Sequence, residues 1–318
     1  MFTQKKRVAI IGGGVIGLTC AYRLLEAGHM VSLFARALPP HTTSDVAAAY
    51  WSPSATDGGS TACTWALDSL EMFRQLTTEP AAGIAILDFY KLNGEPTPMP
   101  YMANAGEVEE ISLGQFPGEW TGYHTTVPRI DVPVYMPWLL ARVEAMGAII
   151  QPHIVQRIGE IKSEFPVIVN CSGLGARLLT SDNVYPIRGQ VMSVRKPEGF
   201  PDQIISADSV EGTTYIISRS RDCLLGGTYQ YFDGEIDVDP AISAAILERC
   251  SRFYPAFAET EIFQHKVGLR PGRDAVRLES EQLRTGQLVI HNYGHGSIGH
   301  TLSWGCAADV VRRVAEHE

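Results

Sequence analysis

The segment from Arg7 to Gly17 constrains the fold of this chain more than any other. An apolar, largely β-branched run, Val8 to Ile11, leads directly into the pattern Gly12-x-Gly14-x-x-Gly17, and helix-type spacing of apolar residues follows at once. This order of strand, glycine turn and helix is typical of the first unit of a dinucleotide-binding fold. In that fold Gly12 permits the tight turn, Gly14 lets a pyrophosphate approach the backbone, and Gly17 lets helix and strand pack closely. The first helical amides, those of Val15 and Ile16, are then expected to face the phosphates.

Composition places the chain among soluble globular proteins. It has 318 residues, of which 45% are hydrophobic and 19% charged, and its net charge is −9. The acidic balance argues against a nucleic-acid partner, which needs a basic face. No apolar run reaches the roughly 18 residues of a membrane span, so no membrane partner is expected. Six scattered cysteines without Cys-x-x-Cys spacing indicate reduced thiols and a cytoplasmic protein. Whether the chain forms a homo-oligomer stays open.

The apolar periodicity indicates a domain that is not continuous in sequence. It predicts a β–α–β unit in the first 50 residues, helices over 64–76, 133–146, 240–254 and 301–314, and strands over 148–154, 166–171 and 287–292. Alternation between 189 and 228 predicts an antiparallel sheet. We therefore expect an α/β fold with a Rossmann-like nucleotide domain built from 1–50, 132–180 and 285–318. A substrate domain with an antiparallel sheet, mainly 51–131 and 181–284, is inserted into it.

The end of the second predicted strand bears on which dinucleotide is bound. NAD-type sites hold the ribose with an acidic residue about 20 residues after the glycines. Here the strand ends in Phe34-Ala35-Arg36, without a carboxylate. Arg36 could accompany the 2′-phosphate of NADP, or it could contact the adenosine of FAD. Spacing alone leaves both cofactors open.

Several separated segments resemble the D-amino-acid oxidase family of flavoproteins, and together they cover nearly the whole chain. They are Val8 to Gly17, His41 to Ala48 with Trp51, Val169 to Gly173, Arg188 to Gln190, Tyr215 to Ile217, Gly226 to Tyr229, Gly268 to Pro271, Val276 to Glu279, and His291 to Gly299 with Trp304. The resemblance implies non-covalent FAD. It also implies oxidation of a D-amino acid by O2 to a 2-oxo acid, ammonia and hydrogen peroxide, with hydride transfer from Cα to flavin N5.

The resemblance also implies a set of cofactor contacts beyond the first glycine turn. The expected residues are Ala35, Arg36, Thr42, Thr43, Ser44, Val155, Ser172, Gly296, Ile298, Gly299, His300 and Thr301. The start of the last helix would then face the flavin ring, where negative charge develops on reduction. His291, His295 and His300 are spaced four and five apart without an acidic or cysteine partner, so no metal site is predicted.

Three residues are expected to carry the chemistry on the substrate side. Arg277 stands in an apolar strand, where a guanidinium needs a partner, and its planar fork matches a carboxylate. An internal ion pair is the alternative. The resemblance implies that Arg277 binds the substrate carboxylate, that the Tyr215 phenol assists it, and that the Ser297 carbonyl accepts from the amine. The wall of the pocket is expected to include Tyr50, Ser52 and Tyr229.

Two departures from the family pattern bear on the substrate. Glu211 stands where animal members carry a lid tyrosine, so a more open pocket is expected. Tyr229 stands where aspartate-selective members carry arginine, which favours neutral or apolar side chains; Arg219 is the nearby cation that could reverse this. D-aspartate oxidase and glycine or amine oxidase are therefore the alternatives within the fold. A flavin-binding protein without catalysis is a further alternative, which the Arg277–Tyr215 pair disfavours.

Overall fold

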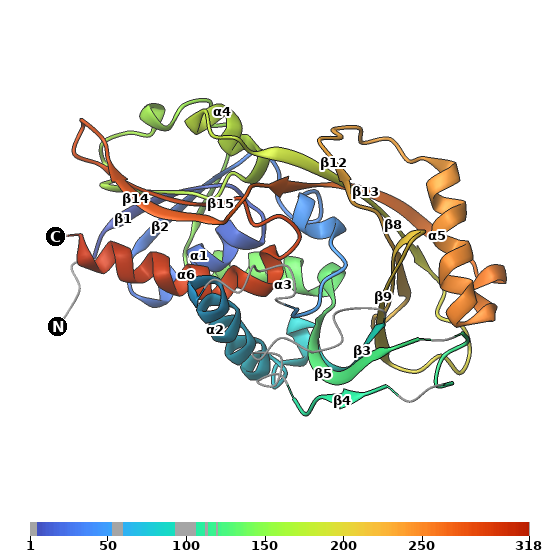
Figure 1. Ribbon diagram of the computed structural model, residues 1–318. Helices are drawn as coiled ribbons and strands as arrows, with labels where there is room; N and C mark the ends of the chain where they lie inside the picture. The colour runs from blue at the N-terminus through green and yellow to red at the C-terminus, as the bar shows by residue number, and fades with distance from the viewer. Residues whose placement is uncertain (1–4, 53–59, 93–105, 112–113, 119, 318) are drawn as a thin grey trace.

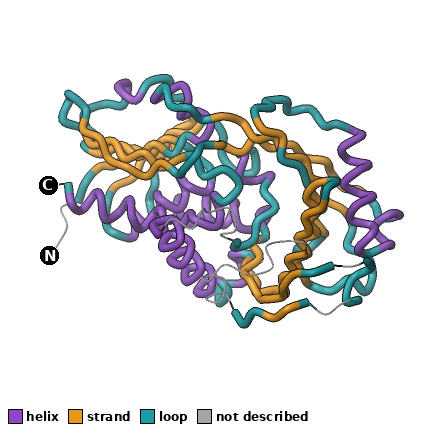
Figure 2. The backbone as a smooth tube through the Cα atoms, in the orientation of Figure 1, coloured by secondary structure: helices purple, strands orange, loops and turns teal. Residues whose placement is uncertain are grey.

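Two β-sheets stand side by side, with helices packed on each, in the computed structural model (Figure 1). The structure describes residues 5–52, 60–92, 106–111, 114–118 and 120–317. Figure 2 shows the strands as two separate groups. The fold class expected from the sequence, an α/β fold with a second, largely antiparallel sheet, is confirmed.

The first sheet is the nucleotide-binding type that the N-terminal glycine pattern predicts. Its six strands lie in the order β14-β15-β7-β1-β2-β6, and all are parallel except β14, which pairs antiparallel with β15. Their bounds are β1 Arg7–Ile11, β2 Met30–Ala35, β6 Ile149–Pro152, β7 Val167–Asn170, β14 Arg277–Gln282 and β15 Leu288–Tyr293. The last segment of this sheet therefore begins at Arg277, whereas the sequence suggests 285, because β14 pairs with β15 over its full length.

The second sheet has nine strands, and it is antiparallel apart from the β3–β9 pair. The order is β12-β8-β11-β10-β9-β3-β5-β4, and β13 also pairs with β8. The bounds are β3 Ile84–Leu92, β4 Glu109–Glu110, β5 Gly122–Ile130, β8 Tyr185–Val194, β9 Gln203–Ser209, β10 Gly212–Ser218, β11 Cys223–Gly226, β12 Gln230–Tyr231 and β13 Ile262–Gly272. The chain thus crosses from the second sheet to the first between Gly272 and Arg277.

Helices pack on both sheets. They are α1 Val15–Glu26, α2 Ser60–Leu76, α3 Val132–Ala145, α4 Ala176–Thr180, α5 Pro240–Phe253 and α6 Gly299–Glu316. In Figure 1, α1 and α6 run beneath the first sheet, and α5 packs on the outside of the second sheet. Helix α5 begins where Asp239 accepts hydrogen bonds from the backbone amides of Ala241 and Ile242, which is a standard N-cap.

The alternation of side chains along the second sheet divides its residues between two cores. Ile204 and Ile217 on one face join the main core shared with the first sheet. Ile205 and Ile216 on the opposite face pack in a separate core that includes residues of α5. Successive residues of a strand point to opposite faces, so the inner face of this sheet is the one that looks toward the first sheet. That face can contribute side chains to a site between the sheets.

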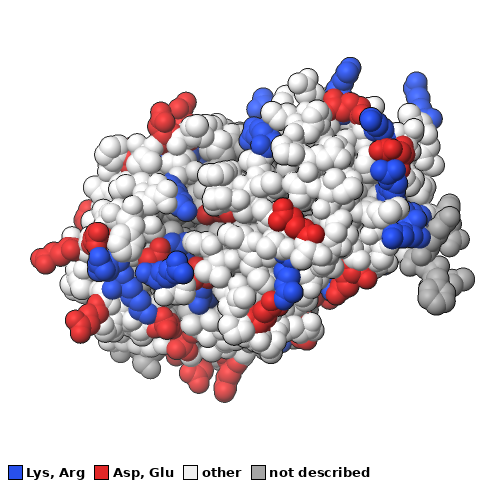
Figure 3. All heavy atoms as spheres, turned by 180° about the vertical axis from the view of Figure 1, so that it is seen from behind, with Lys and Arg blue, Asp and Glu red and all other residues white. Residues whose placement is uncertain are grey.

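The surface carries charges of both signs. On the face that Figure 3 displays, basic and acidic side chains are interspersed, in keeping with the modest net charge of −9. None of the helices in the described ranges is long and apolar enough to span a membrane.

Candidate active site

A cavity of about 1110 Å³ runs from the carboxyl ends of β1, β2 and β7 to the inner face of the second sheet. In open parallel sheets, ligands bind outside the carboxyl ends of the strands. At one end the cavity is lined by the Gly12–Ile16 turn and by the ends of β2 and β7. At the other end Tyr215, Tyr229 and Arg270 come from the second sheet. The cavity therefore reaches from the glycine turn of a dinucleotide site to side chains of the second sheet.

The first glycine turn leaves no room for side chains. Gly12 has φ +118, and a Cβ there would lie 2.3 Å from the carbonyl oxygen of Cys171. A Cβ at Gly17 would lie 1.9 Å from the carbonyl oxygen of Gly12, so α1 approaches β1 directly. Both residues thus act as the glycine pattern predicts. Gly12 and Gly14 line the cavity, whereas Gly17 acts through packing.

The segment after β2 closes over the start of α1. The backbone N–H and the hydroxyl of Thr42 both donate to Asp45 Oδ2, at 2.8 and 2.6 Å. This holds Ser44 so that its Oγ accepts from the Val15 amide at 3.0 Å. Thr42, Thr43 and Ser44 all line the cavity. The polar run predicted to contact the cofactor therefore lies beside the helix N-terminus, where anions are stabilised.

Buried polar atoms without partners mark the other wall of the cavity. Asn292 Oδ1, His295 Nε2 and His300 Nδ1 are buried and accept or donate no hydrogen bond within the described residues, and all three residues line the cavity. Burial lowers the pKa of His295 to about 3 and that of His300 to about 4, so both rings are neutral near pH 7. Because unpaired buried polar groups are costly, this wall fits a polar ring ligand such as a flavin.

Arg270 and Tyr215 meet at the substrate end of the cavity. The Arg270 guanidinium carbon lies 4.2 Å from the centroid of the Tyr229 ring, and its Nη1 donates to the Thr228 carbonyl at 3.0 Å. No carboxylate of the described residues forms an ion pair with Arg270. The Tyr215 hydroxyl is buried without a hydrogen-bond partner there. Burial raises the pKa of Tyr215 to about 12, against the opposing charge of Arg270, so the phenol is a proton donor.

Three glycines make room for this pair. A Cβ at Gly189 would lie 2.3 Å from Arg270 Nη1, and a Cβ at Gly226 would lie 2.0 Å from Cε2 of Tyr215. At Gly227 the Tyr215 hydroxyl would be only 2.1 Å away. Glycine at these positions therefore leaves the space that the guanidinium and the phenol occupy. An uncompensated cation beside an unpartnered hydroxyl is an arrangement that binds a carboxylate.

Arg277, which the sequence predicts as the carboxylate anchor, does not lie beside Arg270 and Tyr215 in this structure. It is the first residue of β14, in the first sheet, whereas Arg270 belongs to β13 of the second sheet. Arg277 is not among the described residues that line the cavity. Its Nε donates to Glu279 at 2.6 Å, and its Nη1 contacts the Tyr293 hydroxyl at 2.5 Å and Asp182 at 3.5 Å. These contacts correspond to the internal ion pair that the sequence left as the alternative, and the role of Arg277 toward a substrate stays a prediction.

Most of the other predicted site residues line the cavity. They are Gly12, Gly14, Val15, Ile16, Arg36, Thr42, Thr43, Ser44, Tyr50, Ser52, Val155, Ser172, Tyr215, Tyr229, Gly296, Ser297, Ile298, Gly299, His300 and Thr301. Ala35 is buried in β2 and does not line it. Arg219 is held by Asp222 in a two-pronged ion pair at 2.6 and 2.7 Å, and it does not line the cavity either.

Glu211 lies in the turn between β9 and β10, where its carboxylate pairs with Arg252 at 2.5 Å. Within the described residues no group of three or more His, Cys, Asp or Glu side chains could hold a metal ion.

Sequence reasoning missed Arg270, although the Gly268 to Pro271 segment was part of the resemblance. The available signal was a glycine pair nearby: Gly268, two residues before Arg270, pairs with Gly189 across β13 and β8, and Arg270 itself pairs with Ile187. Paired glycines on adjacent strands leave open space, which the next long side chain can enter.

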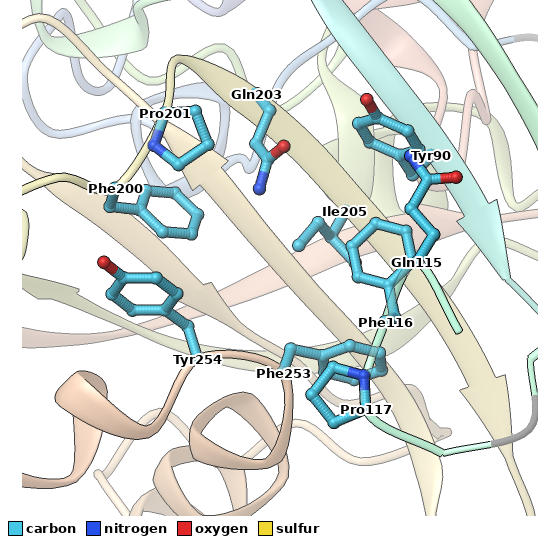
Figure 4. A pocket seen from close by; sticks show the side chains of 10 residues that line it. All are labelled: Tyr90, Gln115, Phe116, Pro117, Phe200, Pro201, Gln203, Ile205, Phe253 and Tyr254. Carbon is cyan, nitrogen blue, oxygen red and sulfur yellow. The ribbon is translucent and has the colours of Figure 1, made fainter.

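A second cavity, of about 230 Å³, lies on the outer face of the second sheet near α5 (Figure 4). The described residues that line it are Tyr90, Gln115, Phe116, Pro117, Phe200, Pro201, Gln203, Ile205, Phe253 and Tyr254. This lining offers aromatic surface and two amides but no cation for an acidic group. The larger cavity is therefore the candidate active site.

The fold and the large cavity are typical of a dinucleotide-dependent enzyme, and comparison with known proteins specifies the class. Residues 7–313 match the family of FAD-dependent oxidoreductases named DAO, and this chain belongs to that family. The predictions of the family, of FAD as the cofactor and of an oxidoreductase acting on a CH–NH2 group are thereby confirmed.

Two relatives and one solved structure illustrate the relationship. A D-amino-acid oxidase of Rubrobacter xylanophilus is 38% identical over 96% of this chain and 94% of its own length. A D-aspartate oxidase of Homo sapiens is 33% identical over 98% of this chain and 95% of its own length. Glycine oxidase from Geobacillus kaustophilus shares the fold with a TM-score of 0.81 at 21% identity, covering 97% of this chain and 95% of that one.

Proposed function

We propose that this enzyme oxidises D-amino acids with neutral or apolar side chains. The amino acid, water and O2 give a 2-oxo acid, ammonia and hydrogen peroxide. The observation that carries the proposal is the uncompensated Arg270 guanidinium beside the unpartnered Tyr215 hydroxyl. Bound FAD supplies the acceptor for the hydride that leaves Cα. The protein then has to bind the carboxylate and the amine so that Cα lies in the right orientation.

In this proposal the carboxylate of the substrate binds beside Arg270 and Tyr215, and the role that the sequence predicts for Arg277 stays a prediction. A guanidinium presents two parallel N–H donors to a carboxylate. The Tyr215 phenol is a neutral donor next to it, and its raised pKa keeps it from acting as a base near pH 7. These two groups bind and orient the substrate, and neither transfers a proton.

The amine is held by the turn that precedes α6. Ser297 lies in this turn and lines the cavity, and its backbone carbonyl is proposed to accept from the amine. With carboxylate and amine both fixed, and Cα–H directed at the acceptor, only one enantiomer leaves its side chain in the remaining space. The family resemblance supports the D form.

The walls around that remaining space favour a neutral side chain. Tyr50, Ser52, Val191 and Tyr229 line the cavity. A second carboxylate buried there without a partner would cost about 1–3 kcal/mol or more. The relationship to a D-aspartate oxidase keeps acidic substrates as a second candidate. The cation that could have served them, Arg219, is already neutralised by Asp222.

Anaerobic mixing of the FAD-loaded enzyme with single amino acids tests the proposal. D-alanine is expected to bleach the flavin absorbance, and L-alanine is expected to leave it unchanged. Admission of air should restore the colour and release hydrogen peroxide. Bleaching by L-alanine, or by neither enantiomer of several neutral amino acids, would contradict the proposed function.

A further inference from the structure

Two exposed apolar side chains line the large cavity at the end away from the second sheet. Ile154 is 57% exposed and Leu178 is 82% exposed, although large aliphatic side chains are usually buried. Both residues line the cavity. A ligand that fills this end of the cavity would remove their apolar surface from water, and this burial would favour its binding.

Ile154 and Leu178 lie at the same end of the cavity, although Ile154 follows β6 and Leu178 belongs to α4. Their sequence neighbours Val155 and Leu179 pack in one hydrophobic cluster, together with Phe34 of β2. Consecutive Cα atoms are only about 3.8 Å apart. The two exposed side chains therefore flank the region where β2 ends.

The backbone that carries Ile154 is fixed by hydrogen bonds on both sides. The His153 amide donates to the Ala35 carbonyl at 3.1 Å, so this segment runs along the end of β2. The Glu160 carboxylate accepts from the Gln156 amide at 3.0 Å, and it lies 3.2 Å from Nε2 of the His153 ring. The position of Ile154 is thus defined by the protein itself.

The strand order indicates which half of FAD reaches these two residues. In this type of fold the pyrophosphate binds at the glycine turn after the first strand, and the adenosine ribose binds at the end of the second. β2 and β6 lie on one side of β1, whereas β7, β15 and β14 lie on the other side, toward the crossing into the second sheet. The adenosine half therefore extends toward the end of β2, where Ile154 and Leu178 lie.

We propose that Ile154 and Leu178 form an apolar clamp on the adenine ring of FAD and thereby set how much more tightly the chain binds FAD than FMN. The flat faces of adenine offer surface against which aliphatic side chains can pack. FMN has the flavin, the ribityl chain and one phosphate, but it has no adenosine for the clamp to hold. The clamp is separate from the substrate end of the cavity, so failure of the proposed function would leave this proposal standing.

The test measures the dissociation constants of FAD and FMN for the full-length chain after its flavin has been removed, with flavin fluorescence as the signal. Ile154→Ala and Leu178→Ala are each expected to raise the dissociation constant of FAD about threefold to tenfold, because each loses apolar contact area. The double variant should show the two effects combined. The dissociation constant of FMN should change less than twofold. ADP, which carries the adenosine half without the flavin, should compete with FAD uptake less well in the same variants and by a similar factor.

Two further variants serve as controls. Ile149 is 58% exposed, almost the same as Ile154, but it is not among the described residues that line the cavity. Ile149→Ala should therefore leave the binding of both flavins within twofold. Leu178→Met keeps an apolar side chain of similar volume and should retain FAD binding.

Because both clamp residues are largely exposed, their replacement should leave the core intact, and the thermal midpoint of the flavin-free chain checks this. Equal weakening of FAD and FMN would overturn the proposal, since it would mean a general change in the cavity. Unchanged binding of FAD and ADP in the double variant would overturn it as well.

Discussion

The guanidinium of Arg270 lies over the ring of Tyr229, and 4.2 Å separates its central carbon from the ring centroid. A cation above an aromatic face is attracted to it, and the ring also limits the directions in which the fork can turn. Tyr229 therefore orients the proposed carboxylate anchor besides lining the pocket. Tyr229 also leaves this position without a second cation that could bind an acidic side chain, which agrees with the proposed preference for neutral substrates.

Arg270→Lys should raise KM for D-alanine about 30-fold or more while FAD stays bound, because an ammonium cannot replace the two parallel donors of the guanidinium. The loss corresponds to about 2–3 kcal/mol, typical of charge-assisted hydrogen bonds. Steady-state kinetics and the flavin spectrum measure both quantities. Arg277→Lys is the matched control outside the cavity, and its KM should change less than threefold. The opposite order would return the anchor to Arg277.

Tyr215→Phe should weaken substrate binding about threefold to tenfold, since one hydrogen bond contributes about 0.5–1.5 kcal/mol. The rate constant of flavin reduction at saturating D-alanine should stay within threefold, because the phenol is proposed to bind and not to transfer a proton. Stopped-flow reduction separates the two. A fall of several orders of magnitude in the reduction step would mean that Tyr215 takes part in acid–base chemistry.

Gly226→Ala should raise KM at least tenfold without loss of FAD, because the new methyl group would lie 2.0 Å from the Tyr215 ring and displace it. The dinucleotide end of the cavity is untouched by this change. Gly159→Ala is the control, since nothing lies within 4 Å of a Cβ there. Normal KM in Gly226→Ala would show that the position of the Tyr215 phenol does not matter for binding.

D-alanine and D-valine should exceed D-aspartate in kcat/KM by about tenfold or more, as expected from a buried carboxylate without a partner at about 1–3 kcal/mol. The comparison uses the unaltered enzyme at one pH and one O2 concentration. If D-aspartate were the best of the three, the neutral-substrate proposal would be wrong, and release of Arg219 from Asp222 would be the first place to look.

The free energy of unfolding should fall as pH falls below about 6.5. Burial holds the pKa of His295 at about 3 and that of His300 at about 4, against 6.5 for an exposed histidine. Between these values the unfolded chain binds protons that the folded chain does not, so each residue removes about 1.4 kcal/mol per pH unit. Denaturant unfolding at pH 7, 6 and 5 measures the slope. His295→Asn should reduce it, and an unchanged slope would show that His295 is not neutral in the fold.

Much of the fold could be predicted because its signals are local. The turn from Gly12 to Gly17 needs glycine for reasons visible in a dozen residues, and Asp239 before Pro240 marks the start of α5. Boundaries were less accurate: α2 begins at Ser60, four residues before the predicted start, and β14 belongs to the first sheet. Strand pairing of that kind depends on contacts far apart in sequence.

The two arginines show why the substrate end could not be settled from sequence. Arg270 and Arg277 both stand beside apolar residues, so local pattern gives each the same need for a partner. What distinguishes them is their partners: Arg277 contacts Glu279 at 2.6 Å and Asp182, 95 positions away, at 3.5 Å, whereas Arg270 forms no ion pair among the described residues. The open space for Arg270 likewise depends on Gly189, on another strand. Only the three-dimensional arrangement reveals which charge is already satisfied.

The strand order of the first sheet has a consequence for how the cofactor can be studied. Its members come from both ends of the described chain and from its middle, so β1 and β15 lie one strand apart although more than 270 positions separate them. No contiguous fragment shorter than residues 7–293 contains the whole sheet. A truncated chain, or one cut by a protease between the sheets and separated, is therefore expected to release its flavin, and the yellow colour of a preparation reports that the entire polypeptide has folded.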